Sequence, residues 1–156
     1  MRYEAARHAC YGRQRGIRRV TERNVLVINC GSSSLKFALI EPISGRVLAH
    51  GLAERLGAEG ASLRTGNGPS TPLPDRADHG AALDEILAGL GGANVSAVGH
   101  RVVHGGEAFS DSVVLDTRAL QAIEACSELA PLHNPANLRG IEAARRRYAD
   151  WCVRRP

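Results

Sequence analysis

The stretch NVLVINCGSSSLKFALIE, residues 24–41, contains two apolar runs separated by a short turn. The first run, residues 24–30, is rich in Val and Ile and predicts a strand buried on both faces. GSSS forms the turn, and residues 35–41 predict a second strand. A Pro and Gly turn signal and a third apolar run, residues 46–56, come next. These three segments predict an antiparallel meander.

Downstream of the meander, the sequence alternates between helical and strand patterns. Residues 57–76 are rich in Gly, Ser, Thr and Pro, which is typical of an exposed loop or a weak hairpin. Asp78 predicts the N-cap of a helix over residues 79–90 that a Gly-Gly pair ends. The apolar stripe of this helix consists of Ala82, Leu83, Ile86, Leu87 and Leu90.

The C-terminal half predicts two more strands and two more helices. VSAVGHRVVH, residues 95–104, is typical of a buried strand, and SVVLD, residues 112–116, of a short one. The next helix has Asp116 or Thr117 at its start and the stripe Leu120, Ile123 and Leu129. Asn134 is expected to cap the last helix, with Pro135 at its first position. This mixture predicts an α/β domain.

The 156 residues carry a formal charge of +4, from 20 basic against 16 acidic groups. Residues 1–23, with seven Arg and two Glu, have a net charge of +5, and residues 145–156, with five Arg and one Asp, have +4. The residues between hold eight basic and thirteen acidic groups, a net charge of −5. Residues 1–23 are expected to be a disordered extension. A non-enzymatic module that binds nucleic acid or another polyanion through these Arg-rich ends is one alternative.

The four cysteines are far apart in the sequence and form no metal-ligand spacing: Cys10, Cys30, Cys126 and Cys152. This argues against a zinc site or a disulfide framework, and we expect a reducing compartment, the cytoplasm. The sequence has no run of about 18 apolar residues, so no membrane association is expected. The N-terminus has charge without an apolar core and does not predict a signal peptide.

The segment NCGSSSLK, residues 29–36, is the first candidate site. A turn of one Gly and three Ser offers several backbone N–H groups and hydroxyls at short range, which suits the oxygens of a phosphate. Lys36, the only lysine of the chain, is two residues past Ser34 and therefore on the same strand face. Asn29 ends the first strand and can orient Mg²⁺ or its water. The alternative is a Ser-rich hairpin turn without a ligand.

The segment HRVVHGGE, residues 100–107, is the second candidate site. In a strand, Arg101 and Val103 would share one face, and His100 and His104 would share the other. An arginine in an apolar strand needs a partner, and a carboxylate or phosphate ligand would supply one. A buried ion pair between Arg101 and a protein carboxylate is the alternative.

The segment APLHNPAN, residues 130–137, is the third candidate site. Two prolines flank His133 just before a helix, and helix N-termini attract anions. The imidazole would there stabilise a transferring phosphoryl group. The alternative is a plain helix entry that Asn134 caps, with His133 incidental.

VLVINCGSSSLKF, GHRVVHGGE and LAPLHNPAN, in this order and spacing, resemble the N-terminal signatures of acetate kinase, within the acetate and propionate kinase family. The resemblance covers about residues 24–148. It implies a ribonuclease H-like N-terminal domain of the acetate and sugar kinase, heat-shock chaperone and actin superfamily, in which two such domains close around ATP. The implied reaction is reversible phosphoryl transfer from ATP to acetate, which gives acetyl phosphate and ADP.

The resemblance also implies a role for each candidate residue. Asn29 matches a Mg²⁺ contact, and the residues at the nucleotide phosphates are Ser32, Ser34 and Lys36. Arg101 matches the arginine that binds acetate or acetyl phosphate, and His133 matches a histidine at the site of phosphoryl transfer. The implied cofactors are ATP or ADP and Mg²⁺, and family members form homodimers.

The resemblance stops near the end of the chain. The family continues with a strand that contributes a catalytic aspartate, whereas residues 151–156 here are WCVRRP. We therefore expect an incomplete kinase domain over residues 24–148, a divergent tail over 149–156, and little activity from the chain alone. A propionate or butyrate kinase fragment is a second alternative. Association with a separate second half, or with a copy of this chain, is a third.

Overall fold

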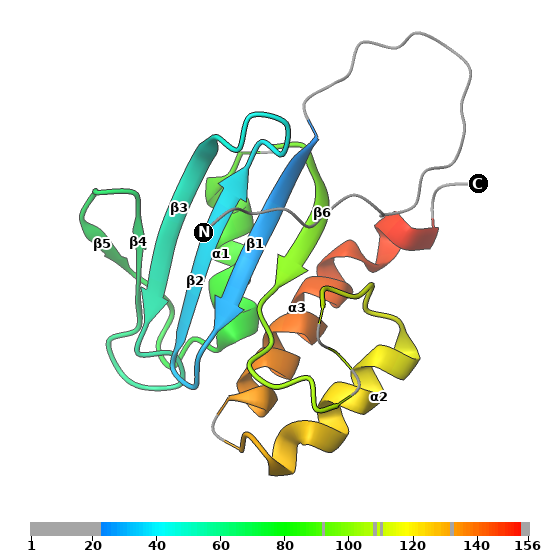
Figure 1. Cartoon of the computed structure of the whole chain (residues 1–156). Coiled ribbons are helices and arrows are strands. Elements are labelled where there is room, and N and C mark those ends of the chain that lie inside the picture. Colours follow the sequence, from blue (N-terminus) through cyan, green and yellow to red (C-terminus); the bar gives the residue numbers. More distant parts are fainter. Residues whose placement is uncertain (1–22, 92, 108, 110, 132, 154–156) are drawn as a thin grey trace, which may run out of the picture.

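The computed structural model describes residues 23–91, 93–107, 109, 111–131 and 133–153. Within them, six strands form one sheet in the order β5-β4-β3-β2-β1-β6 (Figure 1). The strands are β1 (Asn24–Cys30), β2 (Ser34–Ile40), β3 (Val47–Glu54), β4 (Ser62–Thr65), β5 (Ser70–Pro72) and β6 (Val95–His100). The helices are α1 (His79–Gly89), α2 (Thr117–Ala125), the short 3₁₀ turn η1 (Cys126–Glu128) and α3 (Asn134–Val153).

The first three strands form the predicted antiparallel meander. In its register, Asn29 of β1 faces Lys36 of β2, and Lys36 faces Leu52 of β3. The Gly- and Ser-rich segment that follows is a hairpin, β4 and β5, which extends the sheet beyond β3. Of the two predictions for residues 57–76, the weak hairpin is therefore the correct one.

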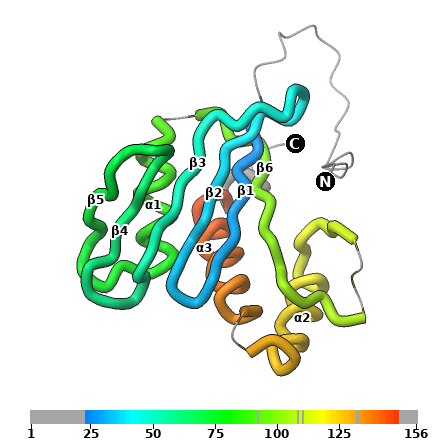
Figure 2. Tube along the Cα trace, turned by 60° about the vertical axis from the view of Figure 1, so that its left-hand side comes forward, coloured from blue at the N-terminus to red at the C-terminus, as the bar shows by residue number. Residues whose placement is uncertain are grey.

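Both α1 and α3 lie on the same side of the sheet (Figures 1 and 2). The side chains of β1 alternate accordingly: Leu26, Ile28 and Cys30 are buried, whereas Val25 and Val27 are only half-buried. The prediction of a strand buried on both faces is therefore wrong, because no described helix covers the second face. The core lies between the sheet and the two helices and includes Leu26, Ile28, Leu35, Phe37, Leu83, Ile86, Ala143 and Ala144.

The strand predicted over residues 95–104 is shorter in the structure. β6 runs parallel to β1 and pairs with it up to His100, which faces Ile28. Arg101 N still donates to Ile28 O at 3.1 Å, but β1 ends at Cys30, so the backbone of residues 102–104 has no strand to pair with. Ser96 and Ala97 are exposed, because β6 is an edge strand of the described sheet.

Two of the predicted helix starts are confirmed. The Asp78 carboxylate accepts a hydrogen bond from Ala81 N at 2.8 Å, and the Asp116 carboxylate accepts one from Ala119 N at 2.7 Å. In the α1 stripe, Ala82, Leu83 and Ile86 are buried, and Leu87 and Leu90 pack against the core.

Two other predictions for the C-terminal half are wrong. Residues 112–116 form no strand, and Val113 and Val114 are 44% and 65% exposed. Strand propensity does not suffice here, because the described structure offers this segment no strand as a neighbour. Leu129, expected in the stripe of α2, is 66% exposed because the chain turns through η1 after Ala125.

No helix in the described part of the chain is long and apolar enough to span a membrane. The prediction of a disordered extension over residues 1–22 and that of a divergent tail at residues 154–156 lie outside the described residues. α3 continues to Val153, so the helix includes the beginning of the predicted tail.

Candidate functional site

The three sequence motifs lie at one end of the sheet, where the parallel strands β1 and β6 both end (Figure 1). Arg101 follows β6 directly, and its backbone N donates a hydrogen bond to Ile28 O at 3.1 Å. The β1–β2 turn and the start of α3 lie at this same end. Ligands of open α/β sheets bind beyond the carboxyl ends of such strands.

The β1–β2 turn is tight, and a side chain of α1 holds it in place. Gly31 N donates to Ser34 O at 2.8 Å, which closes the turn, and the hydroxyl-bearing residues Ser32 and Ser33 are exposed. The His79 ring, at the start of α1, lies beneath the turn with its Nε2 atom 2.7 Å from Gly31 O. Since that oxygen can only accept, Nε2 carries the proton. Rigid, exposed N–H and O–H groups of this kind suit an anion.

Lys36 lies on the uncovered face of the sheet, as does Ser34, with the buried Leu35 between them. This confirms the predicted shared face. The Lys36 side chain is exposed and opposite Asn29 in the β1–β2 register. Neither the Lys36 nor the Asn29 side chain has a hydrogen-bond or ion-pair partner within the described structure, so both are available to a ligand.

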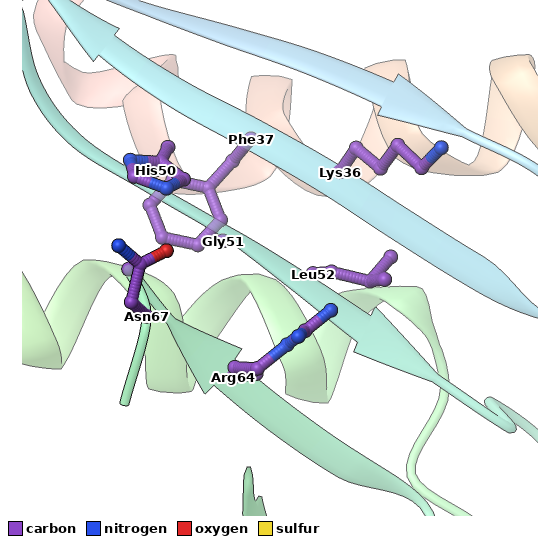
Figure 3. A pocket seen from close by; sticks show the side chains of 8 residues that line it. Lys36, Phe37, His50, Gly51, Leu52, Arg64 and Asn67 are labelled. Carbon is purple, nitrogen blue, oxygen red and sulfur yellow. The ribbon is translucent and has the colours of Figure 1, made fainter. Parts of the chain in front are cut away.

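An open hollow of about 330 Å³ lies on the uncovered face beside Lys36. Figure 3 shows Lys36 and Arg64 on either side of Leu52, on the face away from the helices. The lining comes from β2, β3, β4 and the turn after β4: Lys36, Phe37, His50, Gly51, Leu52, Arg64, Gly66 and Asn67. Lys36 thus lies between this hollow and the end of the sheet where the motifs meet.

Arg101 is exposed, and the alternative of a buried ion pair is wrong. β6 ends at His100, so Arg101 and Val103 are not part of a strand, and both are exposed. Side chains of α3 replace the missing ladder: Val103 N donates to Asn137 Oδ1 at 3.1 Å, and His104 N donates to Asn134 Oδ1 at 3.3 Å. The Arg101 guanidinium is therefore exposed on a backbone that α3 holds.

His133 is exposed immediately before α3, as the third motif predicts. The predicted cap is wrong: the Asn134 side chain is fully buried and binds the backbone of His104 instead of its own helix. The described structure therefore does not support the plain helix entry as the explanation of this motif. His133 lies next to a residue that contacts the Arg101 segment.

The buried Cys30 and the half-buried His100, both behind the site, have shifted pKa values. Burial lowers the pKa of His100 to about 4, with a smaller contribution from the nearby His79, although a hydrogen bond to Arg101 O opposes the shift. Burial also raises the pKa of the Cys30 thiol to about 12, which Arg139 partly offsets. Cys30 is therefore an inert thiol at neutral pH, and His100 is a neutral imidazole.

The half-buried His100 predicts a dependence of stability on pH. The unfolded chain takes up a proton near pH 6.5 and the folded protein only near pH 4, so the unfolded state binds more protons between these values. The contribution of His100 to the free energy of unfolding is therefore complete above about pH 6.5 and decreases as the pH falls toward 4. We expect a loss of about 2 kcal/mol between pH 7 and pH 4.5, measured by urea unfolding.

His100→Gln is the matched variant for this measurement. The other titrating groups remain in it, so the difference between the two pH profiles isolates the contribution of His100. Equal losses in the wild type and in His100→Gln would contradict the prediction.

Asn29 is the one predicted metal contact. The described residues contain no group of three or more His, Cys, Asp or Glu side chains that could hold a metal ion. Mg²⁺ fits such a site when phosphate oxygens and waters supply most of its ligands, as they do in nucleotide complexes. The half-buried Asn29 amide, which has no protein partner in the described structure, fits one such contact.

Sequence reasoning missed His79 and Asn137 in this region. His79 follows the cap Asp78, and the sequence predicts it only as part of a helix. Asn137 lies within the third motif and has no predicted role. The spacing of Asn134 and Asn137 was an available signal, because residues three apart on a helix share one face.

Known proteins resemble this chain in sequence and in structure. The acetate kinase of Pseudomonas aeruginosa is 52% identical over an alignment of 128 residues that covers 78% of this chain and 32% of that protein. The crystal structure of a propionate kinase from Francisella tularensis matches with a TM-score of 0.76 at 36% identity, over 81% of this chain and 34% of that one. The Porphyromonas gingivalis acetate kinase structure matches with a TM-score of 0.73 at 43% identity, over 80% and 34%.

The sheet order and these structural matches define an α/β domain of the ribonuclease H-like class, in the superfamily of acetate and sugar kinases. A model of the acetokinase family matches residues 24–151, and the chain belongs to that family. It spans about one third of the length of the relatives it matches. The family membership agrees with the predicted kinase and transferase character.

Proposed function

We propose that this chain forms one half of a site for reversible phosphoryl transfer between ATP and a short carboxylate, acetate or propionate. The observation that supports this most is the meeting of Asn29, Lys36 and Arg101 at the carboxyl ends of β1 and β6. Each is an available polar group on a separate segment. The geometry suits a reaction between two anions, in which positioning and charge neutralisation lower the barrier.

In this proposal each group has a separate task. The β1–β2 turn, with Ser32 and Ser34, binds nucleotide phosphates, and Lys36 neutralises part of their charge. Arg101 binds the carboxylate or acyl phosphate through paired N–H donors. His133 donates a hydrogen bond to the phosphoryl group during transfer, and Mg²⁺, held partly by Asn29, would neutralise charge on the phosphates.

We also propose that the complete site needs more than this chain supplies, so the chain alone has little turnover. The proposed setting is the reducing cytoplasm. The free thiols of Cys30 and Cys126 are compatible with a reducing compartment. The test therefore measures binding first and turnover second.

Lys36→Met tests the nucleotide half of the proposal. Calorimetric titration of the wild-type chain with ATP and Mg²⁺ is expected to show weak binding, and Lys36→Met is expected to weaken it about tenfold by removing a charge-assisted contact. Arg64→Met is the control, because Arg64 is an exposed cation on the same sheet face but two strands away. No ATP binding by the wild type, or equal effects of both substitutions, would contradict the proposal.

Turnover is measured separately, as acetyl hydroxamate formed from acetate, ATP and Mg²⁺. The chain alone is expected to give little or none. A rate comparable to that of a complete kinase would contradict the proposed half-site.

A further inference from the structure

Two buried amide side chains lie in the first turn of α3. Asn134 and Asn137 are both 0% exposed, although their amides are strongly polar. Three residues apart, they share one face of the helix. Burial of an amide is costly unless its donors and acceptors are paired, so their partners matter.

Asn137 joins the end of β1 to the segment after β6. Its Nδ2 group donates to Cys30 O at 2.6 Å, and its Oδ1 atom accepts from Val103 N at 3.1 Å. Cys30 follows Asn29, and Val103 is two residues past Arg101. The strand ladder between β1 and β6 has already ended at these positions, so Asn137 continues it with a side chain.

Asn134 binds His104, the next residue of the same segment. Its Oδ1 atom accepts from His104 N at 3.3 Å, and its Nδ2 group donates to His104 O at 2.9 Å and to Ile123 O at 3.3 Å. One side chain thus binds both backbone groups of His104 and connects them to the end of α2. His133, the third candidate residue, directly precedes Asn134.

We propose that Asn134 and Asn137 are positioning residues that hold the Arg101 segment against Asn29 and His133. They contact no substrate themselves. The Arg101 backbone has one ladder hydrogen bond, to Ile28 O, but residues 102–104 have no strand beside them, so without Asn134 and Asn137 the exposed Arg101 would sample many positions. A loss of fixed geometry is expensive for a reaction between two anions. The positioning role rests on the proposed function. The hydrogen bonds from Asn134 and Asn137 to residues 103 and 104, here called the tether, are a property of the fold.

The tether is tested by amide hydrogen exchange at Val103 and by trypsin cleavage after Arg101. In Asn137→Ala both rates are expected to rise at least about tenfold, since Val103 N loses its acceptor. In Asn137→Asp the acceptor oxygen for Val103 N remains but the donor to Cys30 O is lost, so exchange at Val103 is expected to lie between the wild-type and the Asn137→Ala rates. The Phe37 amide in β2 and cleavage after Arg46 serve as internal references.

Asn24→Ala is the matched control. Asn24 is also a buried asparagine, 5% exposed, but it lies at the opposite end of β1 and its Oδ1 atom has no partner in the described structure. Unchanged rates in Asn137→Ala, equal rates in Asn137→Asp and Asn137→Ala, or the same increase in Asn24→Ala would each overturn the tether.

The positioning role is tested by the affinity for acetyl phosphate. Asn134→Ala and Asn137→Ala are each expected to weaken binding at least about fivefold, and Asn24→Ala is not. Equal affinity in the wild type and in both α3 variants would overturn the positioning role. If the wild type itself does not bind acetyl phosphate, the proposed function fails, and exchange and cleavage still decide the tether.

Discussion

Gly140→Ala is expected to lower the free energy of unfolding by about 2–3 kcal/mol, because the new methyl group has no room. Gly140 is a buried position within α3, where alanine is normally favourable. Here a Cβ atom would overlap Cys30 Sγ and lie 2.7 Å from His100 Nε2. Both neighbours belong to strands of the core and have little freedom to move, so overpacking outweighs helix propensity.

Gly89→Ala in α1 is the control for this substitution. A Cβ atom at Gly89 would meet nothing within 4 Å, and this variant is expected to be neutral or more stable by up to about 1 kcal/mol. The measurement is urea unfolding of both variants at pH 7. A double variant, Gly140→Ala with Cys30→Ala, makes room for the methyl group and is expected to be more stable than the two single losses predict. Additive losses would contradict a steric origin.

Arg101→Ala is expected to weaken the binding of acetyl phosphate at least about thirtyfold. Hydrogen bonds from a charged donor contribute roughly 1.5–3 kcal/mol, and the exposed guanidinium has no competing protein partner in the described structure. Arg101→Lys keeps the charge but loses the paired donors, so an intermediate loss of about tenfold is expected. Calorimetric titration with acetyl phosphate measures both.

Arg46→Ala is the control for Arg101→Ala. Arg46 is also exposed, but it precedes β3 at the other end of the meander. Its removal changes the net charge by the same amount, so it measures the general electrostatic effect. A loss in Arg46→Ala as large as that in Arg101→Ala would show that the chain attracts acetyl phosphate through net charge alone.

The sequence predicts the meander and the helix starts well because their signals are local. Val and Ile runs, the Pro and Gly turns, and the caps Asp78 and Asp116 each act within a few residues. The single-sided burial of β1 was not predictable from its apolar run. It depends on which faces α1 and α3 cover, and that is decided by residues more than fifty positions away.

The candidate site also has parts that the sequence predicts and parts that it does not. The shared face of Ser34 and Lys36 follows from the period of a strand and was predicted. The exposure of Arg101 was not predicted, because the sequence of residues 95–104 is typical of one continuous strand. In the structure that strand ends at His100, close to the end of its neighbour β1. The side chain of Asn134 has two possible partners of equal chemistry, its own helix and the backbone of His104, and only the packed fold selects between them.

The parallel pairing of β1 with β6 also determines the order in which this chain can fold. The meander joins residues close in sequence, whereas Asn24 faces Val95 across a separation that includes four strands, β2 to β5, and α1. Closing so long a loop loses entropy before any contact compensates for it, so this pairing is expected to form late. Asn29 and Arg101 come together only at that step. Stopped-flow refolding should therefore show the meander protected from exchange before the ligand-binding end exists.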